Sequence, residues 1–325
     1  MRRIILLIII SLTMISVSFR CRAVERIGRL FSDPVVVAGN YTGFCQDKEG
    51  FIWIGSNRGL LRFDGNTYDL YRHDDSSTGS LSDSRILGVM CDSKGRVWVA
   101  TANGLNLYRS SSDDFLTIAL PSEDFFGYII GLAEQSDGTV TFVVSGVGIY
   151  VVSDDAGYPV AVKYYSGDME KDVNTITCGP NGRIYMGTNN GRLNVMAPNG
   201  TINTVNVSDG DYIQALAMES DGNVLVSTLS DLYRLDSSSG KLSHLNVEGL
   251  ISIESLSNLA GTEVYIATSG QGLWRIAAGD DTALKCTDIY SPFINIDTAR
   301  IGSVYNAPGG TLWLGCDYRG IVMVP

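Results

Sequence analysis

The side chains that could carry out chemistry in this 325-residue sequence are few and widely spaced. Only two histidines occur, His73 and His244, and neither lies in an H-E-x-x-H zinc helix or beside a GxSxG elbow. A Ser-His-Asp triad or a two-histidine metal site therefore has no visible basis. Turns such as Asp137-Gly138 and Asp209-Gly210-Asp211 lack the further spaced acids and the final glutamate of a calcium loop. We predict no catalytic residue, no metal and no cofactor.

Carboxylates remain the one open route to catalysis. A glycosidase needs two acids only about 5–10 Å apart, and the sequence contains enough Asp and Glu to supply such a pair by chance. No particular pair is indicated by spacing. We therefore predict recognition rather than catalysis, with a lyase or glycosidase as the weaker alternative.

Large side chains recur at a nearly regular interval along the chain. They are Trp53, Trp98, Phe142, Tyr185, Leu225, Tyr265 and Trp313, at steps of 40 to 48 residues. Three positions later come small hydroxyl or thiol residues, namely Ser56, Thr101, Ser145, Thr188, Thr228, Thr268 and Cys316. A glycine follows in every copy except the fifth, which has Asp231: Gly59, Gly104, Gly148, Gly191, Gly272 and Gly320. Seven copies in phase predict seven repeats of one structural unit.

Each repeat has the pattern of four antiparallel strands. Turn pairs such as Asp137-Gly138 and Asn181-Gly182 precede the large residue and predict tight hairpins. The strand that follows is apolar on both faces, as in residues 51–55, which is typical of a strand packed between two neighbouring sheets. Units of this kind every 40–48 residues are β-propeller blades. We predict an all-β, seven-bladed propeller with four-stranded antiparallel blades.

The seventh repeat ends after its third strand, at residues 321–324. The segment 24–31 at the other terminus belongs to no repeat, so we expect it to supply the missing outer strand and to close the ring by covering an open edge. The position of Trp53, Trp98 and Trp313 in the repeat favours a role in the blade core over a role as sugar-stacking platforms.

The first residues resemble an export signal. Arg2 and Arg3 precede a short apolar run that begins at Ile4, as in a secretory signal peptide. We expect a signal peptide over residues 1–23 and the propeller over residues 24–325, with an uncleaved membrane anchor as the alternative. The net charge is −11, and residues 1–23 contain four arginines and no acid. The remainder is thus strongly acidic, which argues against binding to nucleic acid or anionic lipid.

Five cysteines follow the signal: Cys45, Cys91, Cys178, Cys286 and Cys316. Their number is odd, their spacings are long and no CxxC occurs, so we predict buried free thiols rather than a disulfide framework.

The motif of the first repeat, residues 47–64 (DKEGFIWIGSNRGLLRFD), resembles the two-component regulator propeller repeat. The segment Ser80-Leu81-Ser82 also resembles the linker between the first two blades of that family. The resemblance implies an extracytoplasmic sensor propeller, periplasmic or extracellular, that binds a carbohydrate or another nutrient. Receptors of this kind continue into further domains and a kinase. Because the sequence ends at Pro325, we expect a sensor-type module without kinase or output domain.

Function in a propeller is expected on loops carried by the rigid ring. One end of the ring collects the loops between second and third strands and the connections between blades. Aromatic, amide, acidic and arginine side chains there suit a polyhydroxylated ligand. The predicted ligand-binding residues are Asn57, Arg58, Arg85, Asn103, Tyr128, Asn190, Tyr212, Asp317, Tyr318 and Arg319, with Asn174, Gln271 and Arg300 in the same loops. Arg58 and Tyr318 are the leading pair, because blades one and seven are neighbours. A protein-interaction scaffold of the cell envelope, which would bind a protein partner, is the alternative.

Overall fold

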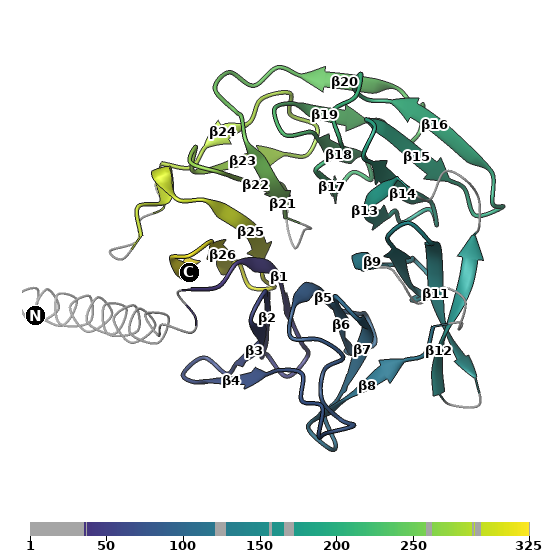
Figure 1. Cartoon of the computed structure of the whole chain (residues 1–325). Coiled ribbons are helices and arrows are strands. Elements are labelled where there is room, and N and C mark those ends of the chain that lie inside the picture. Colours follow the sequence, from purple (N-terminus) through teal and green to yellow (C-terminus); the bar gives the residue numbers. More distant parts are fainter. Residues whose placement is uncertain are drawn as a thin grey trace, which may run out of the picture.

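The seven repeats form seven antiparallel sheets around a central axis (Figure 1). The computed structural model describes residues 36, 38–120, 128–155, 158–165, 172–257, 262–287, 289 and 294–324. Within this part of the chain, six sheets have four strands and the seventh has three. The predicted seven-bladed all-β propeller is confirmed.

The strands follow the order of the sequence, from the inner strand of each blade to its outer strand. Blade one consists of β1 (Tyr41–Gln46), β2 (Ile52–Ser56), β3 (Gly59–Phe63) and β4 (Tyr68–Tyr71). Blade two consists of β5 (Ile86–Cys91), β6 (Val97–Thr101), β7 (Gly104–Arg109) and β8 (Asp114–Ile118). Blade three consists of β9 (Ile129–Glu134), β10 (Val140–Val144), β11 (Gly148–Asp155) and β12 (Tyr158–Tyr165). Blade four consists of β13 (Val173–Cys178), β14 (Ile184–Thr188), β15 (Arg192–Met196) and β16 (Ile202–Asn206).

The remaining blades have the same order. Blade five consists of β17 (Ala215–Met218), β18 (Val224–Ser227), β19 (Leu232–Leu235) and β20 (Leu242–Leu245). Blade six consists of β21 (Ile253–Leu256), β22 (Glu263–Thr268), β23 (Leu273–Ala277) and β24 (Leu284–Lys285). A short 3-10 helix, η2 (Ile296–Thr298), precedes blade seven, which consists of β25 (Ile301–Asn306), β26 (Leu312–Cys316) and β27 (Gly320–Val324).

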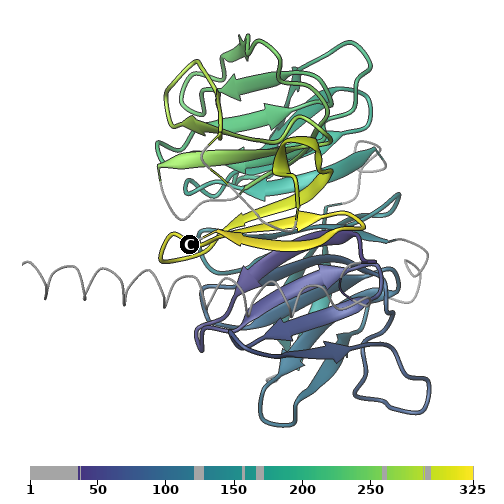
Figure 2. The ribbon, with the colours of Figure 1, turned by 90° about the vertical axis from the view of Figure 1, so that its left-hand side faces the viewer.

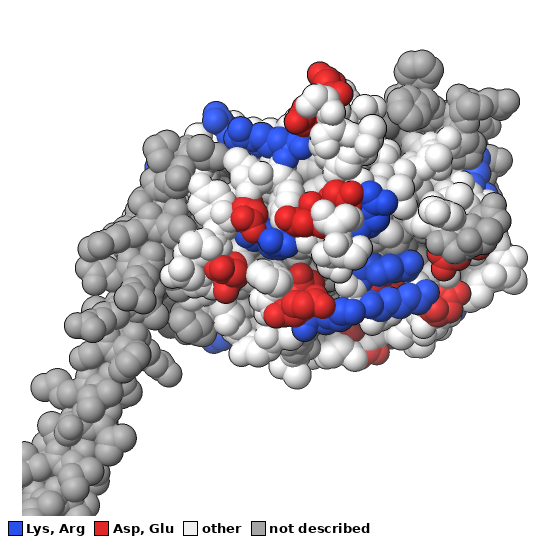
Figure 3. Space-filling model, turned by 90° about the horizontal axis from the view of Figure 1, so that it is seen from below, with Lys and Arg blue, Asp and Glu red and all other residues white. Residues whose placement is uncertain are grey.

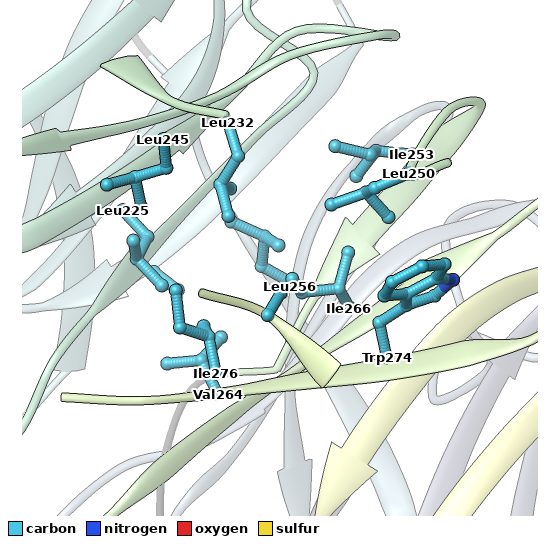
Figure 4. Close-up of a cluster of buried hydrophobic side chains, with 12 residues drawn as sticks. Leu225, Leu232, Leu245, Leu250, Ile253, Leu256, Val264, Ile266, Trp274 and Ile276 are labelled. Atoms are coloured by element: carbon cyan, nitrogen blue, oxygen red, sulfur yellow. The ribbon is translucent and has the colours of Figure 1, made fainter. Parts of the chain in front are cut away.

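The large residue of each repeat lies on the second strand and packs between blades. Six of the seven are buried, namely Trp53, Trp98, Phe142, Tyr185, Leu225 and Trp313, while Tyr265 is partly buried. Figure 4 shows one inter-blade cluster, in which Leu225, Leu232 and Leu245 of blade five face Ile253, Val264 and Ile276 of blade six. The interpretation of the tryptophans as core residues is confirmed, since all three are at most 3% exposed.

Blade seven packs directly against blade one. The yellow strands of blade seven lie beside the purple strands of blade one in Figure 2. Tyr41 and Phe44 of β1 share an apolar cluster with Trp313 of β26, and a Cβ atom on Gly315 would collide with Tyr41. These contacts hold the two ends of the ring together. The expected closing strand, 24–31, and the expected signal, 1–23, lie outside the described residues.

The prediction of five free thiols is wrong for two of them. Cys45 and Cys91 form a disulfide between blades one and two, with Cα atoms 5.7 Å apart, whereas Cys178, Cys286 and Cys316 are free. The step from Trp53 to Trp98 is 45 residues, but the two cysteines are separated by 46. Since side chains alternate along a strand, this extra residue points Cys91 back toward the blade that carries Cys45.

Candidate functional site: the loop face of the ring

The loops between second and third strands and the connections between blades lie at one end of the ring, which we call the loop face. The small hydroxyl residues of the repeat hold these loops. Thr101 Oγ1 donates to the carbonyl oxygen of Gly104 (3.0 Å) and accepts from the Asn103 N–H (3.1 Å). Ser56 Oγ contacts Gly59 O and the Arg58 N–H in the same way. The loops of blades one and two are therefore held in place by internal hydrogen bonds.

The first strand of six blades has an irregularity close to the loop face. The register shifts after the first residue in β1, β5, β13, β21 and β25, and at the corresponding end of β9. Such bulges redirect a side chain out of the regular pleat. The residues at this position are Thr42, Leu87, Ile130, Asn174, Glu254 and Gly302, and Gln214 precedes β17 at the corresponding place.

In blades four to six the side chain or backbone at this position takes part in a series of contacts that connects each blade to the next, as far as blade seven. Asn174 Nδ2 donates to Ile213 O (2.8 Å), and Gln214 Nε2 donates to Glu254 O (3.0 Å). Arg300 Nε then lies 3.3 Å from Glu254 Oε1 and 3.2 Å from Asp317 Oδ2. We call these residues, Asn174, Gln214, Glu254, Arg300 and Asp317, the polar belt.

The polar belt contains more acceptor than donor capacity. One guanidinium, Arg300, serves two carboxylates, and the side chains of Glu254 and Asp317 are only 16% and 6% exposed, respectively. Burial raises the pKa of Asp317 above its ordinary value, although the Tyr41 N–H and Arg300 oppose this shift. Asn174 Oδ1 is buried and has no hydrogen-bond partner among the described residues. Such a set of groups can accept hydrogen bonds from hydroxyl or amine donors.

A cavity of about 880 Å³ lies on the axis of the ring. All seven first strands line it, from Thr42 near the loop face to Pro308 in a turn at the opposite end. The hydroxyls of Ser255 and Ser303 border this cavity and have no hydrogen-bond partner in the described part of the chain. A buried hydroxyl without a partner is costly, so the cavity offers polar groups that solvent or a ligand can satisfy.

The structure brings four of the predicted residues into two contacts. The Arg85 guanidinium lies over the Tyr128 ring, 4.7 Å from its centroid, across the boundary of blades two and three. Arg300 pairs with Asp317 in the polar belt. Tyr128, Tyr212 and Tyr318 are 52%, 41% and 63% exposed. The loop face thus presents three accessible aromatic rings and an arginine stacked on one of them.

Other predicted residues brace the loops. Asn57 Oδ1 accepts from the Asn40 N–H (3.0 Å), Asn103 Nδ2 donates to Ser82 O (3.3 Å), and Asn190 Nδ2 donates to Asp172 Oδ2 (3.3 Å). These bonds use part of the hydrogen-bonding capacity of each amide.

The leading pair, Arg58 and Tyr318, is connected through the segment 39–40. The Tyr318 N–H donates to Gly39 O (3.1 Å), while the loop of Arg58 bonds to Asn40 through Asn57. Arg58 and Arg319 are exposed. The guanidinium of Arg58 has no partner among the described residues and is available to a ligand. Among the described residues, the side chains of Arg58 and Tyr318 form no hydrogen bond or cation–π contact with each other, so their joint role stays a prediction.

The histidines are not arranged for nucleophilic catalysis in the described part of the chain. His244 Nε2 and Ser230 Oγ both contact the Asp231 carboxylate, at 3.0 and 2.9 Å. The carboxylate therefore lies between hydroxyl and imidazole, whereas a triad needs the imidazole next to the hydroxyl. His73 contacts Leu81 O and Asp75 instead.

The outer edge of the ring has charges of both signs. Figure 3, a view from below with respect to Figure 1, shows acidic and basic side chains side by side on this surface. Arg62 pairs with Asp69 and Arg109 with Asp114. A nucleic-acid surface would need clustered Lys and Arg, so this surface does not favour such a partner. Among the described residues, no helix combines the length and apolarity needed to cross a bilayer.

The sequence matches the two-component regulator propeller family over residues 37–58 and 80–103. These stretches contain an aspartate that begins a tight turn and a tryptophan six residues later. The indole Nε1 donates to the aspartate in both blades, from Trp53 to Asp47 (2.7 Å) and from Trp98 to Asp92 (2.8 Å). The resemblance to this family is thereby confirmed on its own motif. No curated protein matches the sequence.

Similar solved structures include the extracellular domains of two putative hybrid two-component systems from B. thetaiotaomicron. They are 20% and 19% identical to the chain, with TM-scores of 0.74 and 0.72, over 88% and 87% of its length. The chain covers only 40% and 39% of theirs. A virginiamycin B lyase from Staphylococcus aureus is 15% identical, with a TM-score of 0.70, 88% of this chain and 94% of that one being covered. At these identities the similarity shows the propeller fold.

Proposed function

We propose that this chain is a ligand-recognition propeller of the sensor type that works outside the inner membrane. The observation that carries the proposal is the loop face, where the polar belt follows blades four to seven and three exposed tyrosines lie among arginine and amide side chains. Aromatic faces stack on the C–H faces of a sugar, and carboxylate and guanidinium groups bind its hydroxyls. The proposed ligand is accordingly a carbohydrate or another polyhydroxylated nutrient.

Two further observations support this proposal. The similar propellers from B. thetaiotaomicron are extracellular domains of putative hybrid two-component systems, and the first two blades carry the two-component regulator propeller repeat. The disulfide between Cys45 and Cys91 is of the kind that persists in oxidising compartments. Export through an N-terminal signal remains part of the proposal.

Thermal shift with a panel of oligosaccharides tests the proposal. A ligand that binds only the native state raises the melting temperature, so at least one sugar should stabilise the wild-type chain. Tyr318→Ala and Arg58→Ala should abolish this shift while leaving the unliganded melting temperature unchanged, because both side chains are exposed.

Tyr158→Ala and Arg109→Ala are the matched controls, since both side chains are exposed beside the turns between third and fourth strands, at the end of the blades opposite the loop face. They should retain the full shift. The proposal fails if no sugar in a broad panel stabilises the chain. If a sugar binds equally well to all four variants, the leading pair is wrong.

A protein partner is the second candidate. Leu229 and Ile251 on the loop face are 46% and 49% exposed, and their segments are joined by a hydrogen bond from the Ile253 N–H to Leu229 O. Exposed apolar side chains at one place favour protein contact. Replacing both by Ser would weaken binding to a protein partner and leave sugar binding intact.

A further inference from the structure

A second cavity, of about 420 Å³, lies on the outer half of blade four, away from the polar belt. Its lining is polar throughout: Asn190, Arg192, Thr204, Asn206, Ser208 and Asp209. None of the belt residues contributes to it. We call it the blade-four pocket.

The strand register and one glycine build this pocket. Arg192 of β15 is directly opposite Asn206 of β16, so both side chains lie on the same face of the sheet. The loop after β16 then folds back on Gly191, whose carbonyl oxygen accepts from the N–H groups of Val207 and Ser208 (2.9 and 3.2 Å). Gly191 has φ +76, and a Cβ atom there would collide with Ser208. The loop is thus held by backbone bonds at a position that requires glycine.

The pocket contains one cation and one anion that do not neutralise each other. Arg192 makes no side-chain ion pair or hydrogen bond in the described part of the chain, although Asp209 lines the same cavity. Asp209 Oδ1 accepts from Asn206 Nδ2 (3.1 Å), and this is its only side-chain partner among the described residues. A guanidinium and a carboxylate that face one cavity without pairing can each form an ion pair with an oppositely charged group of the same bound molecule.

The chemistry of the lining discriminates between ligand classes. No aromatic ring lines the pocket in the described structure, so it lacks the stacking surface that the tyrosines give to the loop face. A simple anion could pair with Arg192 but would leave Asp209 opposed to its charge. A molecule with both a carboxylate and an ammonium group matches both side chains, and the amides and hydroxyls of Asn190, Asn206 and Ser208 can bond to its remaining polar atoms.

We propose that the blade-four pocket is a binding site for a small zwitterion of the α-amino acid class, whose carboxylate pairs with Arg192 and whose ammonium group pairs with Asp209. This pocket lies at the outer rim of the loop face and includes Asn190, but neither Arg58, Tyr318 nor any residue of the polar belt lines it, so the proposal does not depend on the sugar site. The pocket has a volume of about 420 Å³ and is open to solvent, since all of its lining residues except Ser208 are exposed.

The probes are the free L-amino acids, tested singly at millimolar concentration by isothermal titration and thermal shift. At least one should bind. Its N-acetyl derivative lacks the ammonium charge and its amide lacks the carboxylate, so each should bind about tenfold more weakly or worse. Arg192→Gln and Asp209→Asn should cause similar losses without lowering the unliganded melting temperature. Lys241→Gln, which removes an exposed charge outside the pocket, should leave binding unchanged.

Three results would overturn the proposal. The first is that no free amino acid binds to the wild-type chain. The second is that one binds equally well to Arg192→Gln, Asp209→Asn and Lys241→Gln, which would place it elsewhere. The third is that a neutral sugar, rather than an amino acid, loses affinity in Arg192→Gln, which would make the pocket a carbohydrate site. Because Arg58 and Tyr318 do not line this pocket, their variants separate failure here from failure of the loop-face proposal.

Discussion

Blades one and five solve the same structural problem with different chemistry. In blade one, Trp53 occupies the large position, its indole N–H bonds to the turn residue Asp47, and Arg62 is opposite Trp53 on the third strand. In blade five, the corresponding residues are Leu225, Glu219 and Arg234. Leu225 has no N–H to offer, and Arg234 instead bonds to the turn carboxylate through Nε (2.6 Å) and Nη2 (2.8 Å).

Both arginines also reach the next blade. Arg62 contacts Asp113 in the outer hairpin of blade two (3.3 Å), and Arg234 contacts Asp281 in the outer hairpin of blade six (3.2 Å). In blade one, Arg62 lies among the rings of Phe51, Tyr71 and Tyr108. In both blades, an arginine of the third strand forms an ion pair with an aspartate of the next blade. The arginine packs among aromatic rings in blade one, whereas in blade five it also forms a buried ion pair with the turn carboxylate.

The largest expected effect follows from breaking the aromatic form of this unit. Trp98 is fully buried against blade three, so Trp98→Ala should lower the free energy of unfolding by about 3–5 kcal/mol. Trp98→Phe keeps most of the ring but removes the donor to Asp92 and should cost about 1–3 kcal/mol. Urea denaturation of the three proteins measures both values. Equal losses for Ala and Phe would mean that the hydrogen bond, rather than the ring, dominates.

The next largest effect is the difference in stability loss between removing the arginine of the blade-five ion pair and removing the corresponding arginine of blade one. Arg234→Met would leave the carboxylate of Glu219, whose side chain is 0% exposed, without its cationic partner. This change should lower the free energy of unfolding by about 3–5 kcal/mol. Arg62→Met releases Asp69 and Asp113, whose side chains are more than half exposed, and should cost only about 1 kcal/mol.

The double variant Glu219→Gln with Arg234→Met sharpens this contrast, since it also removes the unpaired buried carboxylate of Glu219. It should recover part of the stability lost in Arg234→Met. If Arg62→Met proves as damaging as Arg234→Met, burial of the partner carboxylate does not set the difference between the two blades.

The disulfide comes third. It closes a loop between residues 45 and 91, and a cross-link of this size contributes about 2–4 kcal/mol. Cys45→Ser with Cys91→Ser should therefore lower the melting temperature, and a reducing agent should lower that of the wild-type chain but not that of the variant. Retention of the wild-type melting temperature after confirmed reduction would show that the bridge adds no stability.

The regular part of this architecture could be predicted from the sequence, and the parts that depend on neighbouring blades could not. Trp53, Trp98 and Trp313 were identifiable because a central strand is buried on both faces in every repeat. The bond between Cys45 and Cys91 depends on which faces of two blades meet. The two cysteines are one residue further apart than the two tryptophans, which places Cys91 on the face that meets blade one. This offset can be interpreted only once the strands that carry both cysteines, and the faces of those strands, are known.

The candidate site divides in the same way. Topology places Arg85, Tyr128 and Tyr318 on the loop face, and the repeat alone predicts that placement. The polar belt depends on the irregularity in the first strand. Glu254 stands eleven residues before Tyr265, and only the register shift in β21 reveals that this position is out of the regular pleat. The blade-four pocket depends on how one loop folds back on Gly191, which local patterns do not encode.

The smallest expected effect concerns the charge of Asp92 in blade two. Burial alone would raise the pKa of this carboxyl, but hydrogen bonds from Trp98 Nε1 and from the N–H and Nε of Arg96 outweigh burial and hold the pKa below its ordinary value. A lowered pKa in the folded state adds stability above the unfolded-state pKa of about 4, and this stability is lost as the pH falls through the folded-state pKa. Asp92→Asn should thus cost about 1–2 kcal/mol at neutral pH.

The cost of Asp92→Asn should narrow as the pH falls below about 4, because the wild-type chain then loses its charged carboxylate while the variant has none to lose. Urea denaturation of both proteins across this range measures the difference. Glu49→Gln, an exposed change in the preceding blade, should show a small difference at every pH. A cost for Asp92→Asn that stays constant down to the most acidic folded condition would mean that Trp98 and Arg96 bind the protonated and charged carboxyl equally well. The hydrogen bonds of Asp92 would then stabilise blade two independently of the charge of the carboxyl group.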